Sequence, residues 1–403
     1  MRQIRIPAAF IRGGTSNAIV FKQSDLHART LWDEIFLAAI GSPDPYGRQL
    51  NGMGGGISSL SKVCVVGPPT RADADVDYTF AQVSVSDATV DYGGNCGNMC
   101  SAIGPFAIDE GMLKAEGPST RVRIHNTNTN KIIVACFPLD EGLAAVDGET
   151  EIAGVAGTGA PVDLDFLDPG GAGTGSLLPT GSAEDLLEVP GLGRVLASLV
   201  DAANPFVFVA ADSVGLNGTE MPADIDTLAA VMDRLEAIRA VAGTMMGYAP
   251  TAAEVTERYP SVPKIGVVAP PAESATLTGE RLPTDRMDLT ARMVSMGKVH
   301  RALPLTGVLG LAVAAGIEGT VVHAASALRP HPGGAGIARL IRIAHPSGLV
   351  EASSEVVREQ TPGDRASWHA SVASVRRTQR RLFDGDVYVP ASRLSAALGE
   401  AAD

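Results

Sequence analysis

Short apolar runs, many of them rich in β-branched residues, alternate with polar turns through the first third of the chain and again near its middle. Such runs are typical of strands in a mixed sheet, because β-branched side chains suit a pleated, half-buried surface. The strands predicted on this basis are 9–11, 18–21, 62–66, 78–85, 121–124, 131–137 and 205–209.

Longer apolar segments are predicted as helices. They cover 99–108, 225–245 and 308–317. In the second segment the apolar residues recur at helical spacing and define one face, which comprises Leu228, Val231, Met232, Leu235, Ile238 and Val241. The stretch 168–182 is rich in Gly, Pro, Ser and Thr, so we interpret it as a loop and a candidate boundary.

The strand that begins at Lys62 has a weak echo later in the chain. Residues 62–68 read KVCVVGP, and residues 264–270 read KIGVVAP. Each run is followed by a glycine-containing turn and an apolar helix. If the echo is real, it predicts two similar domains related by a pseudo-twofold axis, with their helix N-termini facing one cleft. We place these domains at 1–184 and 185–375, with the last segment, 376–403, returning to the first domain.

Composition narrows the function classes. The chain has 403 residues, and 32 Lys plus Arg against 45 Asp plus Glu give a net charge of −13, which argues against nucleic acid or an anionic membrane as a partner. The N-terminus lacks the apolar core of a signal peptide, and the most apolar window, 303–317, is too short to cross a bilayer. Four cysteines without framework spacing indicate reduced thiols in a cytoplasmic protein.

Cys96 is the most informative residue, because it lies between glycines in the sequence GNCGNM at 94–99, directly before a predicted helix. Free backbone N–H groups and the helix dipole at such a junction favour thiolate over thiol. The alternative is that Cys96 is a small buried hydrophobic residue, which is the usual fate of a free cysteine. Cys100 follows one turn later and is interpreted as a structural core residue.

Lys62 is the second candidate, at the head of an apolar strand. Such a lysine either extends to solvent or points into a pocket, where partial burial would lower its pKa and suit it to general base catalysis. The turn 12–16, with sequence RGGTS, is either a plain turn or a cradle for a carboxylate. The glycine loop 52–56 lacks the Gly-Lys-Ser/Thr ending of a P-loop, which disfavours a nucleotide.

Blocks along nearly the whole chain resemble the PrpF family of cofactor-independent isomerases. That family includes 2-methylaconitate isomerase, methylitaconate Δ-isomerase and 4-oxalomesaconate tautomerase, and it shares the diaminopimelate-epimerase fold. The matching blocks are RGGTS at 12–16, GSPDPYGRQ at 41–49, SSLSKV at 58–63, GNCGNM at 94–99, NTNT at 126–129, LPTG at 178–181, SMGK at 295–298 and DGDVYVP at 384–390.

The resemblance implies an α/β (α+β) fold of two pseudo-symmetric diaminopimelate-epimerase-like domains, with the active site in the cleft between them and neither metal nor cofactor. It implies that Lys62 and Cys96 are the catalytic acid/base pair. The chain departs from the family where Asn17-Ala18 replaces the usual Lys-Gly, and Ser176 replaces a frequent lysine. The segments it implies for substrate binding contain Thr15, Ser16, Asn17, Arg48, Gly97, Asn98, Met99, Ser295 and Met296.

The function expected from these residues is a 1,3-proton shift in an unsaturated di- or tricarboxylate of the aconitate, methylaconitate, itaconate or oxalomesaconate type. Two-thiol epimerases carry a cysteine at both facing helix starts, whereas the second helix start here, at 303–307, has none. The alternatives are a two-base racemase or epimerase of a small amino or hydroxy acid, a non-catalytic carboxylate-binding protein, and a cysteine hydrolase. A homodimer is considered as the assembly.

Overall fold

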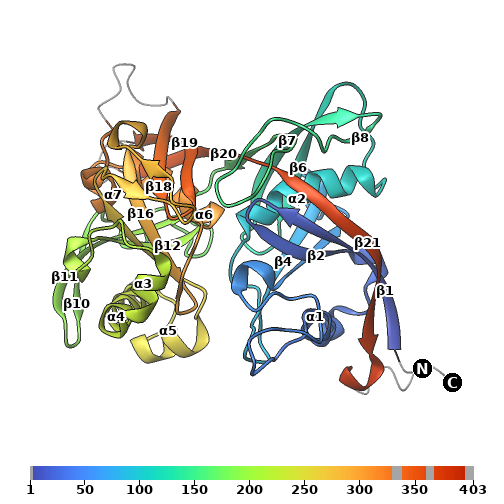
Figure 1. Ribbon diagram of the computed structural model, residues 1–403, viewed down its shortest axis with the longest axis horizontal. Coiled ribbons are helices and arrows are strands. Elements are labelled where there is room, and N and C mark those ends of the chain that lie inside the picture. Colours follow the sequence, from blue (N-terminus) through green and yellow to red (C-terminus); the bar gives the residue numbers. More distant parts are fainter. Residues whose placement is uncertain (1–2, 329–337, 360–366, 395–403) are drawn as a thin grey trace.

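The computed structural model describes residues 3–328, 338–359 and 367–394. Its ribbon forms two lobes that lie side by side, the first holding the N-terminal part of the chain and the second most of the later part (Figure 1). Strands dominate both lobes, and helices cover the faces of the sheets. The expected mixed α/β class is confirmed.

The first lobe contains ten strands and two α-helices among the described residues. The strands are β1 (Gln3–Gly13), β2 (Ser16–Lys22), β3 (Lys62–Gly67), β4 (Val76–Val83), β5 (Val90–Asp91), β6 (Ser119–Asn126), β7 (Lys131–Asp140), β8 (Leu143–Ala144), β9 (Val162–Leu167) and β21 (Gln379–Pro390). The helices are α1 (Trp32–Ile40) and α2 (Gly97–Asp109).

The second lobe is built from similar elements and a small separate hairpin. Its main strands are β10 (Asp185–Val189), β11 (Gly193–Ala202), β12 (Asn204–Ala210), β13 (Lys264–Ala269), β16 (Leu289–Ser295), β17 (Lys298–Val299), β18 (Arg339–His345), β19 (Gly348–Glu359) and β20 (Ser367–Arg377). The hairpin is β14 (Ser274–Ala275) with β15 (Arg281–Leu282), and the helices are α3 (Pro222–Thr227), α4 (Ala229–Met245), α5 (Ala252–Arg258), α6 (Leu305–Gly316) and α7 (Val321–Ala325).

Strand pairing in the two lobes is the same when each is followed from the middle outwards. From β9 the neighbours run β7, β6, β4, β3, β2, β1 and β21; from β20 they run β19, β18, β16, β13, β12, β11 and β10. The parallel pairs occupy matching places, β4–β6 with β16–β18 and β2–β3 with β12–β13. The expected pseudo-symmetry is therefore confirmed, and β3 and β13, which carry the sequence echo, are equivalent strands.

The two ladders meet where β20 pairs antiparallel with β9, between Val372↔Leu167 and Arg377↔Val162. The chain then continues into β21, which pairs with β1 from Gln3↔Pro390 to Gly13↔Gln379. In Figure 1 these two strands cross from the second lobe to the first and run down its outer side. The boundaries 1–184, 185–375 and 376–403 stay predictions, and residues 395–403 lie outside the described residues.

Two equivalent helices fill the centre of the molecule. Because a parallel strand pair needs a crossover connection, α2 links β4 to β6 and α6 links β16 to β18. One continuous core surrounds both, and separate cores lie under α1 and under α4 on the outer faces of the sheets. The glycine at the start of α2 lies against the start of α6, because a Cβ on Gly97 would come 2.5 Å from Leu305 Cδ2 and 3.2 Å from Thr306 Cγ2.

The helix predicted over 225–245 is wrong in one respect. The chain forms two helices, α3 and α4, with a break at Leu228, whose ψ of 76° is not helical and whose side chain is 44% exposed. The two helices serve different surfaces: Asp226 of α3 accepts a hydrogen bond from the Val299 N–H of β17, whereas α4 packs against β10 and α5. Apolar spacing alone does not reveal this break between two helices that pack against different elements.

Candidate active site

Cys96 caps the N-terminus of α2. Its backbone is extended (φ −102°, ψ 93°), and its carbonyl accepts the N–H groups of Met99 (3.0 Å) and Cys100 (3.3 Å). The N–H groups of Gly97 and Asn98 bond to none of the described residues, so they remain available to a ligand. The helix dipole adds positive potential at this end, and Cys96 keeps 9% of its surface exposed.

Lys62 begins β3 and lies on the same face of the sheet as α2. Val63 and Val65 pack into the core under α1, whereas Cys64 and Val66 pack into the central core with Cys96. Alternation along a strand therefore directs the Lys62 side chain towards the Cys96 side. Lys62 is 8% exposed, and its Nζ donates to Gln82 Oε1 at 2.5 Å on the adjacent strand β4.

Tyr78 connects the backbone of Cys96 to the side chain of Cys64, two residues after Lys62. Its hydroxyl donates to the Cys96 carbonyl (3.4 Å), and Cys64 donates from Sγ to the same hydroxyl (3.7 Å). Burial raises the pKa of the Cys64 thiol, and the charges of Cys96 and Lys62 both act on it, which places Cys96 and Lys62 within electrostatic range of Cys64. Burial also raises the pKa of Cys100, so Cys64 and Cys100 stay protonated at neutral pH.

The β1–β2 hairpin brings Thr15 and Ser16 to the start of α2. Thr15 Oγ1 accepts from Asn98 Nδ2 at 3.0 Å, and Ser16 is buried. Gly14 makes this approach possible: its φ is +52°, and a Cβ there would lie 2.3 Å from Asn98 Oδ1. That Asn98 oxygen is buried without a hydrogen-bond partner among the described residues, which is uncommon in folded proteins.

The second lobe contributes a lysine that the sequence interpretation did not assign to the site. Lys264 begins β13, the strand equivalent to β3, and its Nζ donates to the Ser261 carbonyl (3.0 Å). Burial, with the positive charge of Lys62 adding to it, lowers the pKa of Lys264 to about 8, while Asp91 and Cys96 act in the opposite direction. Lys264 is therefore close to both candidate catalytic groups, and the echo at 264–270 was the signal that could have found it.

Ser295 ends β16, the strand beside β13, and Met296 follows it. The antiparallel register Ile265↔Val294 places Ser295 at the next position opposite Lys264, and Met296 turns the chain with a φ of +53°. His300 follows: burial lowers the pKa of its ring to about 3, with Lys264 and Lys62 adding to the effect. The imidazole is therefore neutral, and its Nε2 is buried without a partner.

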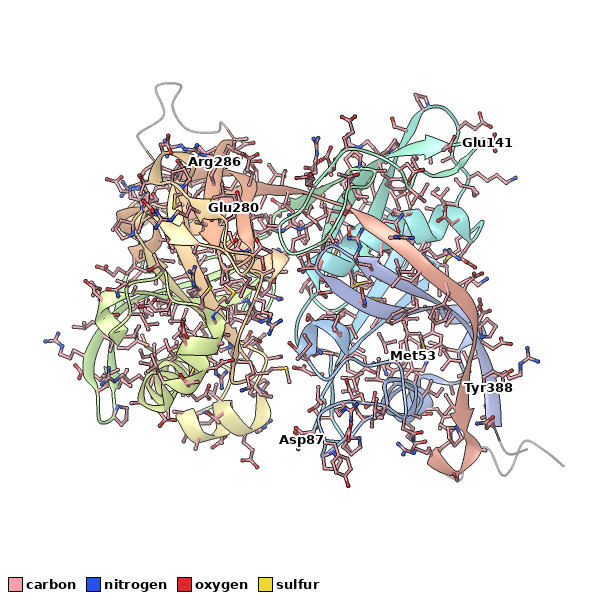
Figure 2. The ribbon with its side chains drawn as sticks, in the orientation of Figure 1. Met53, Asp87, Glu141, Glu280, Arg286 and Tyr388 are labelled. Atoms are coloured by element: carbon pink, nitrogen blue, oxygen red, sulfur yellow. The ribbon has the colours of Figure 1, made fainter. Side chains whose placement is uncertain are left out.

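The resemblance implies substrate binding for Met99, Asn17 and Arg48, but their side chains lie in the core, on the α1 face of the sheet and in a separate pocket. The Met99 side chain is fully buried in the central core. Asn17 lies one residue from Ser16 on β2, and alternation puts its side chain on the α1 face. Arg48 lines a separate surface pocket of about 560 Å³ with Asp44, Tyr46 and Arg393. The Asp44 backbone N–H donates to the Val85 carbonyl, in the β4–β5 turn that also carries Asp87 at the lower tip of the lobe (Figure 2).

Within the described ranges, no three His, Cys, Asp or Glu side chains are grouped in a way that would hold a metal ion. None of the helices in this part of the chain combines the length and apolar character that crossing a membrane requires.

The arrangement of two paired lobes is also found in solved structures of other proteins. A hydroxyproline epimerase from Agrobacterium vitis, solved with bound trans-4-hydroxy-L-proline, superimposes with a TM-score of 0.54 over 97% of this chain and 94% of that one, at 12% identity. At this identity the likeness concerns the fold alone. A methylitaconate Δ-isomerase structure is more similar, with a TM-score of 0.76 and 40% identity over 98% of this chain and 97% of that one.

The chain belongs to the PrpF family, whose model, described as PrpF protein, matches residues 3–390. It is 41% identical to 3-methylitaconate isomerase from Eubacterium barkeri over 97% of this chain and 99% of the relative. It is 37% identical to 2-methyl-aconitate isomerase from Shewanella oneidensis, over 96% and 98%. It is 36% identical to 4-oxalomesaconate tautomerase from Pseudomonas putida, over 96% and 97%. The expected family is therefore confirmed.

Proposed function

We propose that this protein is a cofactor-independent isomerase that moves a double bond by a 1,3-proton shift in an unsaturated di- or tricarboxylate. The observation that carries the proposal is the position of Cys96 at the N-terminus of α2, which lies against the start of α6 of the other lobe. The electrostatic effects of Lys62 and Cys96 on Lys264 of the second lobe support it. An amine and a thiol can exchange protons with carbon acids, and a second ammonium suits a substrate with more than one carboxylate. The activities named for the relatives, on methylitaconate, methylaconitate and oxalomesaconate, support the same substrate class.

The proposed reaction moves one proton and one double bond. Lys62 or Cys96 removes an allylic proton, so a C–H bond breaks and an N–H or S–H bond forms. The electron pair delocalises through the alkene into the adjacent carboxylate as a dienolate. The other group then donates a proton to the far carbon, and solvent exchange restores both groups. No net electron or atom is gained, so the substrate and product are isomers.

The developing negative charge needs donors that are already oriented. The unpaired N–H groups of Gly97 and Asn98 at the positive end of α2 are suited to this role. Lys264, on the opposite lobe, is suited to bind a carboxylate, because a protonated amine with little solvent access gains more from an anion than an exposed one does. Thr15, Ser16 and Ser295 supply hydroxyl groups around these charges.

Proton NMR in D₂O tests the function directly. Purified protein is incubated with trans-aconitate, a methylaconitate, itaconate, a methylitaconate and an oxalomesaconate-type acid. The expected result is deuterium incorporation at the allylic position together with the signals of the isomer for at least one acid. Absence of both exchange and isomerisation for every acid would contradict the proposal, and binding without exchange would indicate a non-catalytic protein.

The two-base racemase alternative is less consistent with α6. Its N-cap is Pro304, and Leu305 and Thr306 begin the helix, so the position equivalent to Cys96 carries no thiol. A racemase would exchange deuterium at one saturated carbon and invert it without moving a double bond. A cytoplasmic location, a homodimer and the absence of a nucleic-acid partner stay predictions from the sequence.

A further inference from the structure

Gln82 is the described residue that holds the Lys62 amine, and its own orientation is fixed. Lys62 Nζ donates to Gln82 Oε1. The amide nitrogen of Gln82 donates to the carbonyls of Ser58 and Ser61, each at 3.0 Å. Rotating the amide by half a turn would set its oxygen against these two carbonyls and its nitrogen against the amine. The oxygen of Gln82 is therefore fixed as an acceptor facing Lys62.

The chemical nature of this acceptor matters for proton transfer. An amide oxygen accepts an N–H from either the charged or the neutral form of an amine, whereas a carboxylate holds a buried amine as the ammonium ion. Within the described part of the chain, no carboxylate is within ion-pair distance of Lys62. The Phe80 ring lies 5.0 Å from Nζ, and the charge of Lys264 acts from the other lobe.

We propose that Gln82 is a positioning residue for Lys62, one that fixes the amine on the Cys96 side of the sheet while leaving it free to gain and lose a proton. The proposal deepens the function given above and rests on it. A purely structural role would require only that the turn before β3 be tied to β4. The proposed role also requires that the partner of Lys62 be neutral, and this requirement is testable by substitution.

The first test compares Gln82→Glu with a matched control, Gln49→Glu. Gln49 is also a buried glutamine tied to the turn before β3, because its Oε1 accepts from Ser61 Oγ (2.7 Å) and from the Gly56 N–H (2.8 Å). In Gln82→Glu the limb of the kcat profile that reports Lys62 should move up by about one pH unit or more, with KM within about threefold of wild type; this is the acidic limb if Lys62 is the base and the alkaline limb if Lys62 is the acid. Gln49→Glu should lower thermal stability without moving that limb.

A second variant and a second readout keep the proposal testable if Gln82→Glu does not fold. Gln82→Met retains the length of the side chain but removes the amide oxygen that accepts from Lys62, so it should lower kcat at least about tenfold with little change in KM. Gln82→Asn should not restore kcat, because its side chain is too short to reach Nζ. Carbamylation of Lys62 by cyanate, measured by peptide mass spectrometry across pH, reports the free amine without any substrate.

The outcomes separate the two proposals. If wild type isomerises no acid, the proposed function fails, yet a shift of Lys62 carbamylation to higher pH in Gln82→Glu and not in Gln49→Glu still supports the role of Gln82. If wild type is active but neither the kcat profile nor the carbamylation profile moves in Gln82→Glu, the role of Gln82 is overturned. For Gln82→Met, a kcat loss explained entirely by a smaller folded fraction would also overturn it.

Discussion

Asn204 and Asn95 bond reciprocally across the two lobes. Asn204 Nδ2 donates to the Asn95 carbonyl (3.0 Å), and the Asn95 N–H donates to Asn204 Oδ1 (3.1 Å). Asn204 also donates to Thr306 Oγ1 (3.2 Å) at the start of α6. Because Asn95 immediately precedes Cys96, a side chain of the second lobe fixes the loop that presents the thiol of the first.

Asn204→Ala should therefore impair both stability and turnover. It leaves two backbone groups of Asn95 without partners in a buried setting, which we expect to cost about 2–4 kcal/mol in the free energy of unfolding. The position of Cys96 is loosened at the same time, so kcat should fall at least about tenfold. Thermal denaturation and steady-state kinetics measure the two effects. Asn217→Ala, on the surface, is the control and should change neither.

Lys62→Ala and Cys96→Ala should each lower kcat at least about a hundredfold, because each removes one of the two groups that exchange protons with the substrate. Circular dichroism should show an intact fold in both. Cys136→Ala is the thiol control and should retain wild-type turnover, since Cys136 lies half-buried on β7. Near-wild-type activity in both site variants would refute the assignment of the pair.

Lys264→Met should raise KM about 10- to 100-fold, which corresponds to the loss of one charged hydrogen bond to a carboxylate. The pH dependence gives a second signature. Because burial lowers the pKa of Lys264 to about 8, the ammonium form predominates below that pH and is lost above it. The wild-type kcat/KM should fall on the alkaline side with an apparent pKa near 8, and the variant should lack that limb.

The matched control for this experiment is Lys298→Met, since Lys298 is an exposed lysine of the same lobe. It should leave both KM and the alkaline limb unchanged. An alkaline limb that persists in Lys264→Met would show that another group titrates there.

Gly14→Ala should be more harmful than Gly111→Ala, although both glycines have positive φ. At Gly111 (φ +66°) nothing lies within 4 Å of an added Cβ, so the cost is that of backbone strain, about 1 kcal/mol. At Gly14 the Cβ also meets the Asn98 side chain, which must move away from Thr15. The difference between the two unfolding free energies measures this contact, and equal losses would contradict it. Only Gly14→Ala should also raise KM.

Local sequence pattern predicted much of the fold and the elements that carry Cys96 and Lys62. The glycines around Cys96 and the apolar run after it indicated a helix start, and α2 begins at Gly97. The β-branched run after Lys62 indicated β3, which starts at that residue. Both features depend on neighbouring residues in the chain, so a single sequence contains them.

Features that depend on distant contacts were not predictable in the same way. The charge of Lys62 acts on Lys264 only because two lobes with equivalent ladders lie side by side, and a short echo in the sequence could not establish that arrangement. The placement of Arg48 depends on how the loop after α1 packs near Arg393, which is far away in the sequence. Leu228 has the correct spacing for a helix, yet it lies where α3 and α4 diverge.

The shared position of β20 has a consequence for the way the protein unfolds. Its backbone is hydrogen-bonded to β19 on one side and to β9 on the other, and the strand that follows it completes the ladder of the first lobe beside β1. A fragment ending at residue 184 would leave the edges of β9 and β1 bare, and bare edges promote intermolecular aggregation. The halves should therefore melt in one cooperative transition, and neither should survive as a separate polypeptide.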